Sequence, residues 1–211
     1  MDRKYTTIFG AAVCSIALWG FSWFIHYDFP AILISVAALI LSAYIFSRNI
    51  LNFSDLRRKI GDFTTGKNYI PLCIGGILSG IVTELLYRWH LGISLVPVSL
   101  NYFVIIAALI GAMEELVFRG FIQEQVKYLN GPFSVLFSTL SHTGYKCCLF
   151  LSPMALYNID VLNLAFWTFL FGLIFGSIKH ITKSILPSLK AHAIFDIWVY
   201  SELMKAPWWV W

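Results

Sequence analysis

Charged residues are scarce in this sequence, where they make up 12% of 211 residues. That is about half the share found in an ordinary soluble domain. Hydrophobic residues make up 59% of the sequence. Their side chains carry more apolar surface than the core of a soluble protein of this size can bury. The scarcity of charge therefore excludes an ordinary soluble domain and indicates a polytopic protein with lipid as its solvent. No long polar stretch, low-complexity linker or internal repeat interrupts the chain.

Several catalytic and metal-binding motifs are also missing. The four cysteines form no CxxC pair, so neither a zinc knuckle nor a disulfide framework is expected. The HExxH motif of zincins and the Gly-x-Gly-Asp motif of presenilin-like aspartyl proteases do not occur. Residues 76–80 superficially resemble a rhomboid serine motif but lack the glycine two positions before the serine. We interpret this stretch as small residues for helix packing.

The apolar runs predict the fold class. A spanning helix needs about 20 apolar residues, and a backbone in lipid must satisfy its own hydrogen bonds, which favours helices. We therefore expect an all-α transmembrane bundle of about seven spans, near residues 5–25, 29–47, 69–87, 102–122, 133–149, 160–179 and 185–204. The expected divisions are N-terminal helices over 1–99, a catalytic helical core over 100–204 and an interfacial aromatic tail over 205–211.

Basic residues are distributed unevenly over the two sides that these spans define. One side receives Arg3, Lys4, Arg48, Arg57, Arg58, Lys59, Lys67, Lys127, Lys179 and Lys183, and the other receives Arg88, Lys146 and Lys205. Because cytoplasmic loops are enriched in lysine and arginine, we expect an integral protein of a bacterial or archaeal plasma membrane with a cytoplasmic N-terminus. Residues 48–68 are expected to include a basic amphipathic helix on the inner leaflet. The net charge of +4 is explained in this way, and no nucleic-acid partner is expected.

Ionisable residues inside spans are costly, so each requires a reason. Glu114 and Glu115 lie in the fourth predicted span, and Arg119 follows Glu115 by four residues. This spacing places Glu115 and Arg119 on one helical face, where they can form an ion pair. Glu114 then lacks a cation on its own helix. A carboxylate placed in this way can serve as a general base or acid.

Two other predicted spans supply histidines. His142 lies in the fifth span, and His192 and Asp196 lie four residues apart in the seventh, on one helical face. Glu114 and one histidine could activate water, and the second histidine could stabilise the oxyanion of a tetrahedral intermediate, as peptide hydrolysis requires. Glu114, His142, His192 and Asp196 also form a feasible zinc site, and the residue pattern does not choose between these alternatives.

Another pair of charges, Glu84 and Arg88, lies near the end of the third predicted span. We interpret it as a local ion pair because the two residues are four positions apart. Lys190 is close to His192 in sequence. Its side chain either extends to the membrane interface or tunes the site.

Three features of the sequence resemble the CPBP family. They are Glu-Glu-x-x-x-Arg at 114–119, a histidine in the next span and His-x-x-x-Asp at 192–196. That family comprises CAAX prenyl endopeptidases and bacteriocin-processing or self-immunity proteins, also called Abi proteins. The resemblance covers roughly residues 100–200. It implies a glutamic-type intramembrane endopeptidase with a cavity open toward the cytoplasm. It also implies that Glu114 activates water with help from His142, while His192 and residue 196 stabilise the oxyanion.

The sequence departs from the family pattern at two positions. The family usually has Phe four residues before the first histidine, where this chain has Ser138, with Phe137 one residue earlier. Many members have Asn where this chain has Asp196. An ionised aspartate cannot donate to an oxyanion, so Asp196 is expected to be protonated, to orient His192 or to favour a metal.

The candidate catalytic residues are thus Glu114, Glu115, His142, His192 and Asp196, with Arg119 as a structural ion-pair partner. The predicted activity is hydrolysis of a peptide bond in a membrane-associated protein or peptide, with no certain cofactor and zinc as the candidate. The alternative is a non-enzymatic self-immunity or scaffold protein of the same fold. A proton-coupled transporter is disfavoured because the sequence shows no inverted repeat or paired broken helices.

Overall fold

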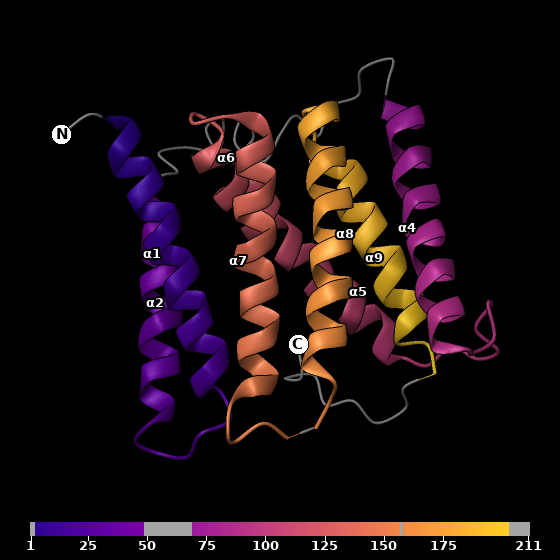
Figure 1. Cartoon of the computed structure of the whole chain (residues 1–211), viewed down its shortest axis with the longest axis horizontal. Coiled ribbons are helices and arrows are strands. Elements are labelled where there is room, and N and C mark those ends of the chain that lie inside the picture. Colours follow the sequence, from indigo (N-terminus) through magenta and orange to yellow (C-terminus); the bar gives the residue numbers. More distant parts are fainter. Residues whose placement is uncertain (1–2, 49–68, 157, 203–211) are drawn as a thin grey trace.

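A computed structural model describes residues 3–48, 69–156 and 158–202 of the chain (Figure 1). Its helices are α1 (Arg3–Phe24), α2 (Ile32–Arg48), α4 (Tyr69–Leu91), α5 (Phe103–Glu115), η1 (Leu116–Ile122), α6 (Gln123–Val126), α7 (Gly131–Leu151), α8 (Val161–Thr182) and α9 (Leu186–Val199). The predicted all-α class is confirmed. The amphipathic helix predicted within 48–68 and the aromatic tail predicted at 205–211 lie outside the described residues.

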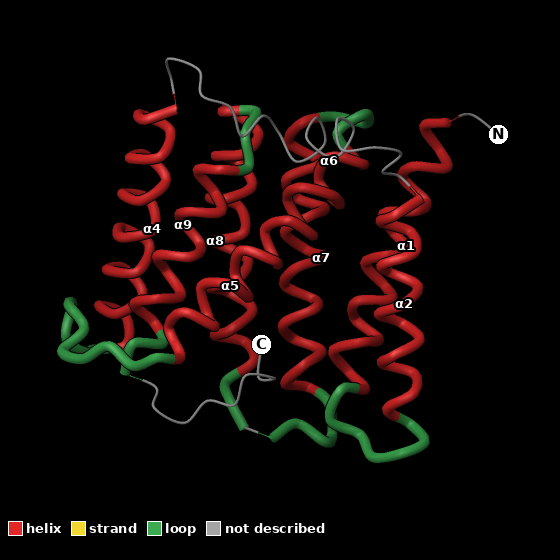
Figure 2. The backbone as a smooth tube through the Cα atoms, turned by 180° about the vertical axis from the view of Figure 1, so that it is seen from behind, coloured by secondary structure: helices red, strands yellow, loops and turns green. Residues whose placement is uncertain are grey.

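Helices occupy the positions of all seven predicted spans when α5, η1 and α6 are taken as one continuous run, as Figure 2 shows. In the described part of the chain, three helices are long and apolar enough to cross a membrane, within Thr7–Phe24, Tyr69–Leu91 and Val161–Thr182. A fourth, Ile32–Arg48, is apolar but shorter. Three spans are therefore supported by length and composition, and the full set of seven stays a prediction.

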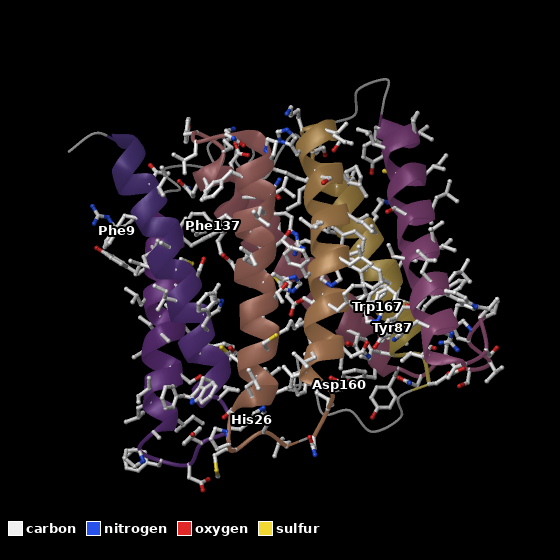
Figure 3. The ribbon with its side chains drawn as sticks, in the orientation of Figure 1. Phe9, His26, Tyr87, Phe137, Asp160 and Trp167 are labelled. Atoms are coloured by element: carbon white, nitrogen blue, oxygen red, sulfur yellow. The ribbon has the colours of Figure 1, made fainter. Side chains whose placement is uncertain are left out.

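The outer surface of the bundle is apolar and its interior contains polar groups. Large exposed hydrophobic side chains include Leu33 and Ile40 and Phe9, which projects from α1 in Figure 3. Buried positions include Ser15, which bonds Ser141 across α1 and α7, and the ionisable residues of the predicted site. A soluble protein would reverse this pattern, so the arrangement is that of an integral membrane protein.

Successive helices alternate in direction, which gives the bundle two distinct ends (Figure 1). We call the end where α1, α4, α7 and α9 begin the basic end, because Arg48, Lys127 and Lys183 lie there. We call the opposite end the far end, where the same four helices finish. The site residues lie between these two ends.

Close helix contacts bring α9 against α4 and α5, and α7 against α8 and α1. Small residues permit the approach of α4 to α9. A Cβ added at Gly80 would lie 2.5 Å from the Ala191 carbonyl oxygen, and one added at Gly76 would collide with the backbone of Pro187. The interpretation of residues 76–80 as a packing stretch is therefore confirmed, and this packing holds α9 in place.

A buried cluster around Arg88 ties the far end together. Arg88 lies 3.8 Å from Glu84 and 3.1 Å from Glu202, which includes the ion pair predicted from the sequence. Its Nε also donates to the Ser94 carbonyl, and its Nη1 donates to the Trp198 carbonyl. The cluster thus joins the end of α4 to the loop that follows it and to the end of α9.

We expect Gly80→Ala to destabilise the protein by about 1–3 kcal/mol, because the added methyl group overpacks the α4–α9 contact. Gly75 is the matched control, since it lies on the same helix and a Cβ there would meet nothing within 4 Å. Gly75→Ala should be neutral or slightly stabilising, by about 0.5–1 kcal/mol. Thermal unfolding in detergent measures both variants, and equal effects of the two would contradict the close contact.

Candidate active site

The two adjacent glutamates lie at the junction of α5 with the π-helix η1, which interrupts the α-helical pattern from Leu116 to Ile122. Both side chains are buried, with Glu114 6% exposed and Glu115 fully enclosed. Short π-helical segments are often found at functional sites. Ser138 of α7 donates a 2.6 Å hydrogen bond to the Phe118 carbonyl of η1, so this departure from the family pattern supports the irregular turn.

Glu115 is held from two directions. Arg119 lies 3.0 Å from its carboxylate, as the four-residue spacing suggests, and His192 Nδ1 of α9 lies 3.0 Å from the same oxygen. Both partners are buried. A buried charge is costly unless it is paired and hydrogen-bonded, so Glu115 fixes α9 against the junction of α5 and η1.

Arg119 also determines the proton position on His142. Its Nη1 lies 3.1 Å from His142 Nδ1, and a guanidinium can only donate. His142 Nδ1 is therefore the acceptor, which leaves Nε2 to carry the proton of the neutral ring. That Nε2 lies 3.0 Å from Glu114 Oε2 and donates to it. The imidazole thus connects the Arg119 guanidinium to Glu114.

The second oxygen of Glu114 has a partner that the sequence reasoning missed. Lys146 Nζ lies 2.6 Å from Glu114 Oε1. From the sequence we assigned Lys146, which lies near the end of the predicted span 133–149, only to the few cations of the outer side. The available signal was its position four residues after His142, which places both side chains on the same face of α7.

His192 and Asp196 face the same region from α9. His192 Nε2 lies 3.8 Å from Glu114 Oε2 and 3.7 Å from Asp196 Oδ2. Close packing requires glycine opposite them, because a Cβ at Gly111 of α5 would collide with the Asp196 carboxylate. The structure therefore brings together Glu114, His142 and His192 from three helices, with Asp196 at the edge.

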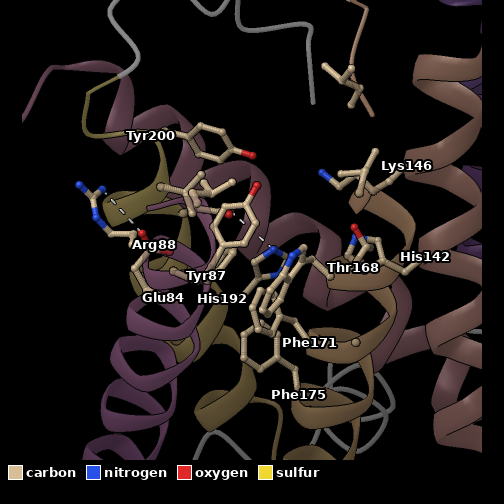
Figure 4. A pocket seen from close by; sticks show the side chains of 18 of the residues that line it. Glu84, Tyr87, Arg88, His142, Lys146, Thr168, Phe171, Phe175, His192 and Tyr200 are labelled. Carbon is tan, nitrogen blue, oxygen red and sulfur yellow. Dashed lines mark ion pairs between the residues drawn. The ribbon is translucent and has the colours of Figure 1, made fainter. Parts of the chain in front are cut away.

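A cavity of about 890 Å³ adjoins this cluster, between α4, α7, α8 and α9. Figure 4 shows His142, His192 and Lys146 facing the same space. These three residues lie on the cavity wall together with Arg119 and Asp196, while Glu114 lies behind them. Further polar side chains of the wall are those of Glu84, Arg88, Asn158, Thr168 and Glu202. Aromatic rings form much of the remainder, from Tyr87, Trp167, Phe171, Phe175 and Phe195. Lys190 is not part of this wall.

The cavity extends from Phe175 in the middle of the bundle to Leu91, Ile93 and Asn158 at the far end. Its opening is thus opposite the basic end. The distribution of basic residues predicts that the basic end is cytoplasmic, whereas the family resemblance implies a cavity that opens toward the cytoplasm. These two expectations are incompatible in this structure.

The zinc alternative receives no geometric support. In residues 3–48, 69–156 and 158–202, no group of three or more His, Cys, Asp or Glu side chains is arranged to hold a metal ion. The positions next to Glu114 are instead occupied by the Lys146 ammonium and the His142 ring. A second cation at that carboxylate would be repelled by the first.

Replacing Arg119 should be strongly destabilising. We expect Arg119→Met to lower the free energy of unfolding by about 3–5 kcal/mol, because the buried Glu115 carboxylate would lose its guanidinium partner and keep only its contact with His192. Lys127→Met is the matched control, because it removes the cation of the exposed Lys127–Glu124 pair and should cost no more than about 1 kcal/mol. Chemical or thermal unfolding in detergent compares the two, and a small loss for Arg119→Met would contradict the buried pairing.

Comparison with known proteins gives one match. The sequence model of a family described as type II CAAX prenyl endopeptidase Rce1-like matches residues 93–198, which is half of the chain. No curated protein and no solved structure matches the chain. The matched residues include all six members of the predicted site.

Proposed function

Since the chain belongs to the Rce1-like family of type II CAAX prenyl endopeptidases, we propose that it is a glutamic-type intramembrane endopeptidase. Its substrate is a membrane-associated protein or peptide, and Glu114 is the general base. The observation that carries this proposal is the convergence of Glu114, His142 and His192 from three helices beside a cavity of about 890 Å³.

The first step is activation of water by Glu114. Its Oε2 is held by His142 Nε2 at 3.0 Å and its Oε1 by Lys146 at 2.6 Å. The carboxylate is therefore fixed in position, directly behind His142 and Lys146, which line the cavity. A water molecule next to Oε2 would lose its proton to Glu114 as its oxygen attacks the carbonyl carbon.

The second step is stabilisation of the negative charge that develops on the carbonyl oxygen. His192 lies on the cavity wall, and its Nε2 is 3.8 Å from Glu114 Oε2. When protonated, Nε2 can donate a hydrogen bond to the carbonyl oxygen of the substrate. Such fixed donors stabilise a tetrahedral intermediate strongly in a site that excludes water. Glu115, 3.0 Å from His192 Nδ1, orients this ring, and Asp196 lies 3.7 Å from its Nε2. Glu114 then returns its proton to the leaving amine.

Glu114→Gln and His142→Ala should each abolish cleavage, by on the order of 10²–10⁴-fold, because the general base or its support is lost. Substrates can be found by comparing protein and peptide termini in membranes that contain the wild type or Glu114→Gln. Cleavage products should occur only with the wild type. Glu124→Gln is the control, because Glu124 bonds Lys179 and Lys127 away from the cavity.

If the Glu114→Gln variant folds normally and still produces the same termini, the glutamate mechanism is wrong. If the wild type produces no new terminus, a non-enzymatic role of this fold is favoured instead.

Lys146 should act as a positioning residue for Glu114. We expect Lys146→Met to lower kcat on the order of 10²-fold with little change in KM, because the Glu114 carboxylate would lose one of its two partners and would no longer be fixed in one orientation. Lys146→Arg should restore part of the rate. The control is Lys190→Met, which removes a cation that does not line the cavity. A rise in KM without a fall in kcat would show that Lys146 contacts the substrate instead.

A further inference from the structure

The charged groups around the cavity do not balance. The lysine and arginine side chains of its wall are each engaged by a carboxylate, in the pairs Arg119–Glu115, Lys146–Glu114 and Arg88–Glu202. Two more carboxylates, those of Glu84 on α4 and Asp196 on α9, line the same cavity. In the described part of the chain, the carboxylates around the cavity therefore outnumber the cations while the histidines are neutral.

Glu84 is the first of these surplus carboxylates. It is fully buried, and among the described residues neither of its oxygens has a hydrogen-bond partner. Arg88 Nη1 lies 3.8 Å from Glu84 Oε1, which is beyond hydrogen-bond distance. The guanidinium donates instead to the Trp198 carbonyl and to Glu202. One guanidinium thus serves two carboxylates here, and one negative charge is left over.

Asp196 is the second. Its side chain is 9% exposed and lines the cavity, and it accepts no hydrogen bond from residues 3–48, 69–156 and 158–202. The nearest donor is His192 Nε2 at 3.7 Å, and the other nitrogen of that ring is already used by Glu115. When His192 is protonated, its single charge offsets only one of the two surplus carboxylates. The cavity thus keeps an excess of negative charge in either state of the ring.

Aromatic rings lie beside both carboxylates. Tyr87 follows Glu84 on α4 by three residues, and Phe195 directly precedes Asp196 on α9. The ring of Tyr87 lies 5.8 Å from that of Phe195 and 5.4 Å from that of Trp167, between centroids, and all three rings line the cavity. Aromatic rings attract organic cations, and a buried carboxylate is costly unless a cation pairs with it. Both kinds of group therefore favour the same ligand.

A metal ion fits this surplus less well than an organic cation. In the part of the chain that the structure describes, no three carboxylate, histidine or cysteine side chains are arranged to hold a metal. A single ammonium or guanidinium group needs only one or two carboxylates, and it also gains from neighbouring rings. The geometry thus points to a cation that belongs to a larger organic molecule.

We propose that the part of the cavity between Glu84 and Asp196 is a subsite for a cationic group of the substrate. The word substrate rests on the proposed function. The cation is an ammonium or guanidinium group, carried by a lysine or arginine side chain or by the free N-terminus of a peptide. Because Asp196 is 3.7 Å from His192 Nε2, the charged residue lies at or next to the bond that is cleaved.

Charged thiol reagents measure the potential in the cavity of the full-length protein without a substrate. Thr168→Cys places a thiol on the cavity wall in α8 (Figure 4), and Met154→Cys places one at an exposed position outside it. The unmodified protein gives the background of its free native cysteines. In a neutral detergent, we expect the ratio of the rates with a cationic and an anionic methanethiosulfonate to be at least about 10-fold higher at Thr168→Cys.

Asp196→Asn and Glu84→Gln should each lower this ratio several-fold, because each removes a surplus charge and keeps the size of the side chain. Glu124→Gln is the matched control and should leave the ratio unchanged, since Glu124 pairs with Lys127 and Lys179 away from the cavity. The comparison of the two cysteines requires no change to any carboxylate. Equal ratios at the two cysteines, or a ratio that both cavity variants leave unchanged, would overturn the proposal.

Three short peptides distinguish the two sources of the cation. They are a capped peptide with a central lysine, the same capped peptide with norleucine, and the norleucine peptide with a free N-terminus. Each is added to Thr168→Cys before a neutral thiol reagent. Protection at a concentration at least about 10-fold lower than the capped norleucine peptide requires assigns the subsite to a side chain for the lysine peptide, and to the N-terminus for the uncapped one. Equal protection, or none, by all three would overturn the proposal.

These readouts are separate from the proposed catalytic role, because thiol modification requires no cleavage. If a cationic peptide protects better while Glu114→Gln still produces the same termini as the wild type, the subsite stands and the glutamate mechanism fails. If Glu114→Gln is inactive and the three peptides protect equally, the mechanism stands and the subsite fails.

Discussion

The structure depends on the need to pair every charge that the bundle encloses. Glu115 is fully buried and is paired with Arg119 on its own helical run and with His192 on α9. Because an unpaired carboxylate in such surroundings would cost several kcal/mol, these contacts fix how α5 and α9 pack. Arg119 extends the same network to His142 on α7. The geometry of the candidate catalytic residues therefore follows from the need to pair the buried charge of Glu115.

The adjacent glutamates consequently have different surroundings, although they differ by one position in the chain. Glu115 is enclosed by partners that hold helices together. Glu114 is held through its two oxygens by His142 and Lys146, both of which line the cavity. The π-helix that begins after Glu115 lets Arg119 reach both Glu115 and His142. Glu115 thus holds together the helices that position Glu114.

Much of this arrangement could be predicted from the sequence, because charge inside apolar runs is rare and each case needs a partner. The helix positions, the Glu115–Arg119 pair and the candidate set of Glu114, His142 and His192 follow from periodicity and spacing. Lys146 was not predicted as a site residue, because a lysine near the end of an apolar run usually extends to the interface. The π-helix left no compositional signal. The direction of the cavity depends on how α4, α7, α8 and α9 pack around it, which no local pattern encodes.

The division of labour between the two glutamates is the central claim, and Glu115→Gln tests it most directly. The measurement is turnover per folded molecule together with the unfolding temperature, for Glu115→Gln and Glu114→Gln in the same detergent. We predict that Glu115→Gln lowers the unfolding temperature more and keeps a larger share of the turnover, whereas Glu114→Gln stays folded and is inactive. A stable but inactive Glu115→Gln beside an active Glu114→Gln would contradict the account.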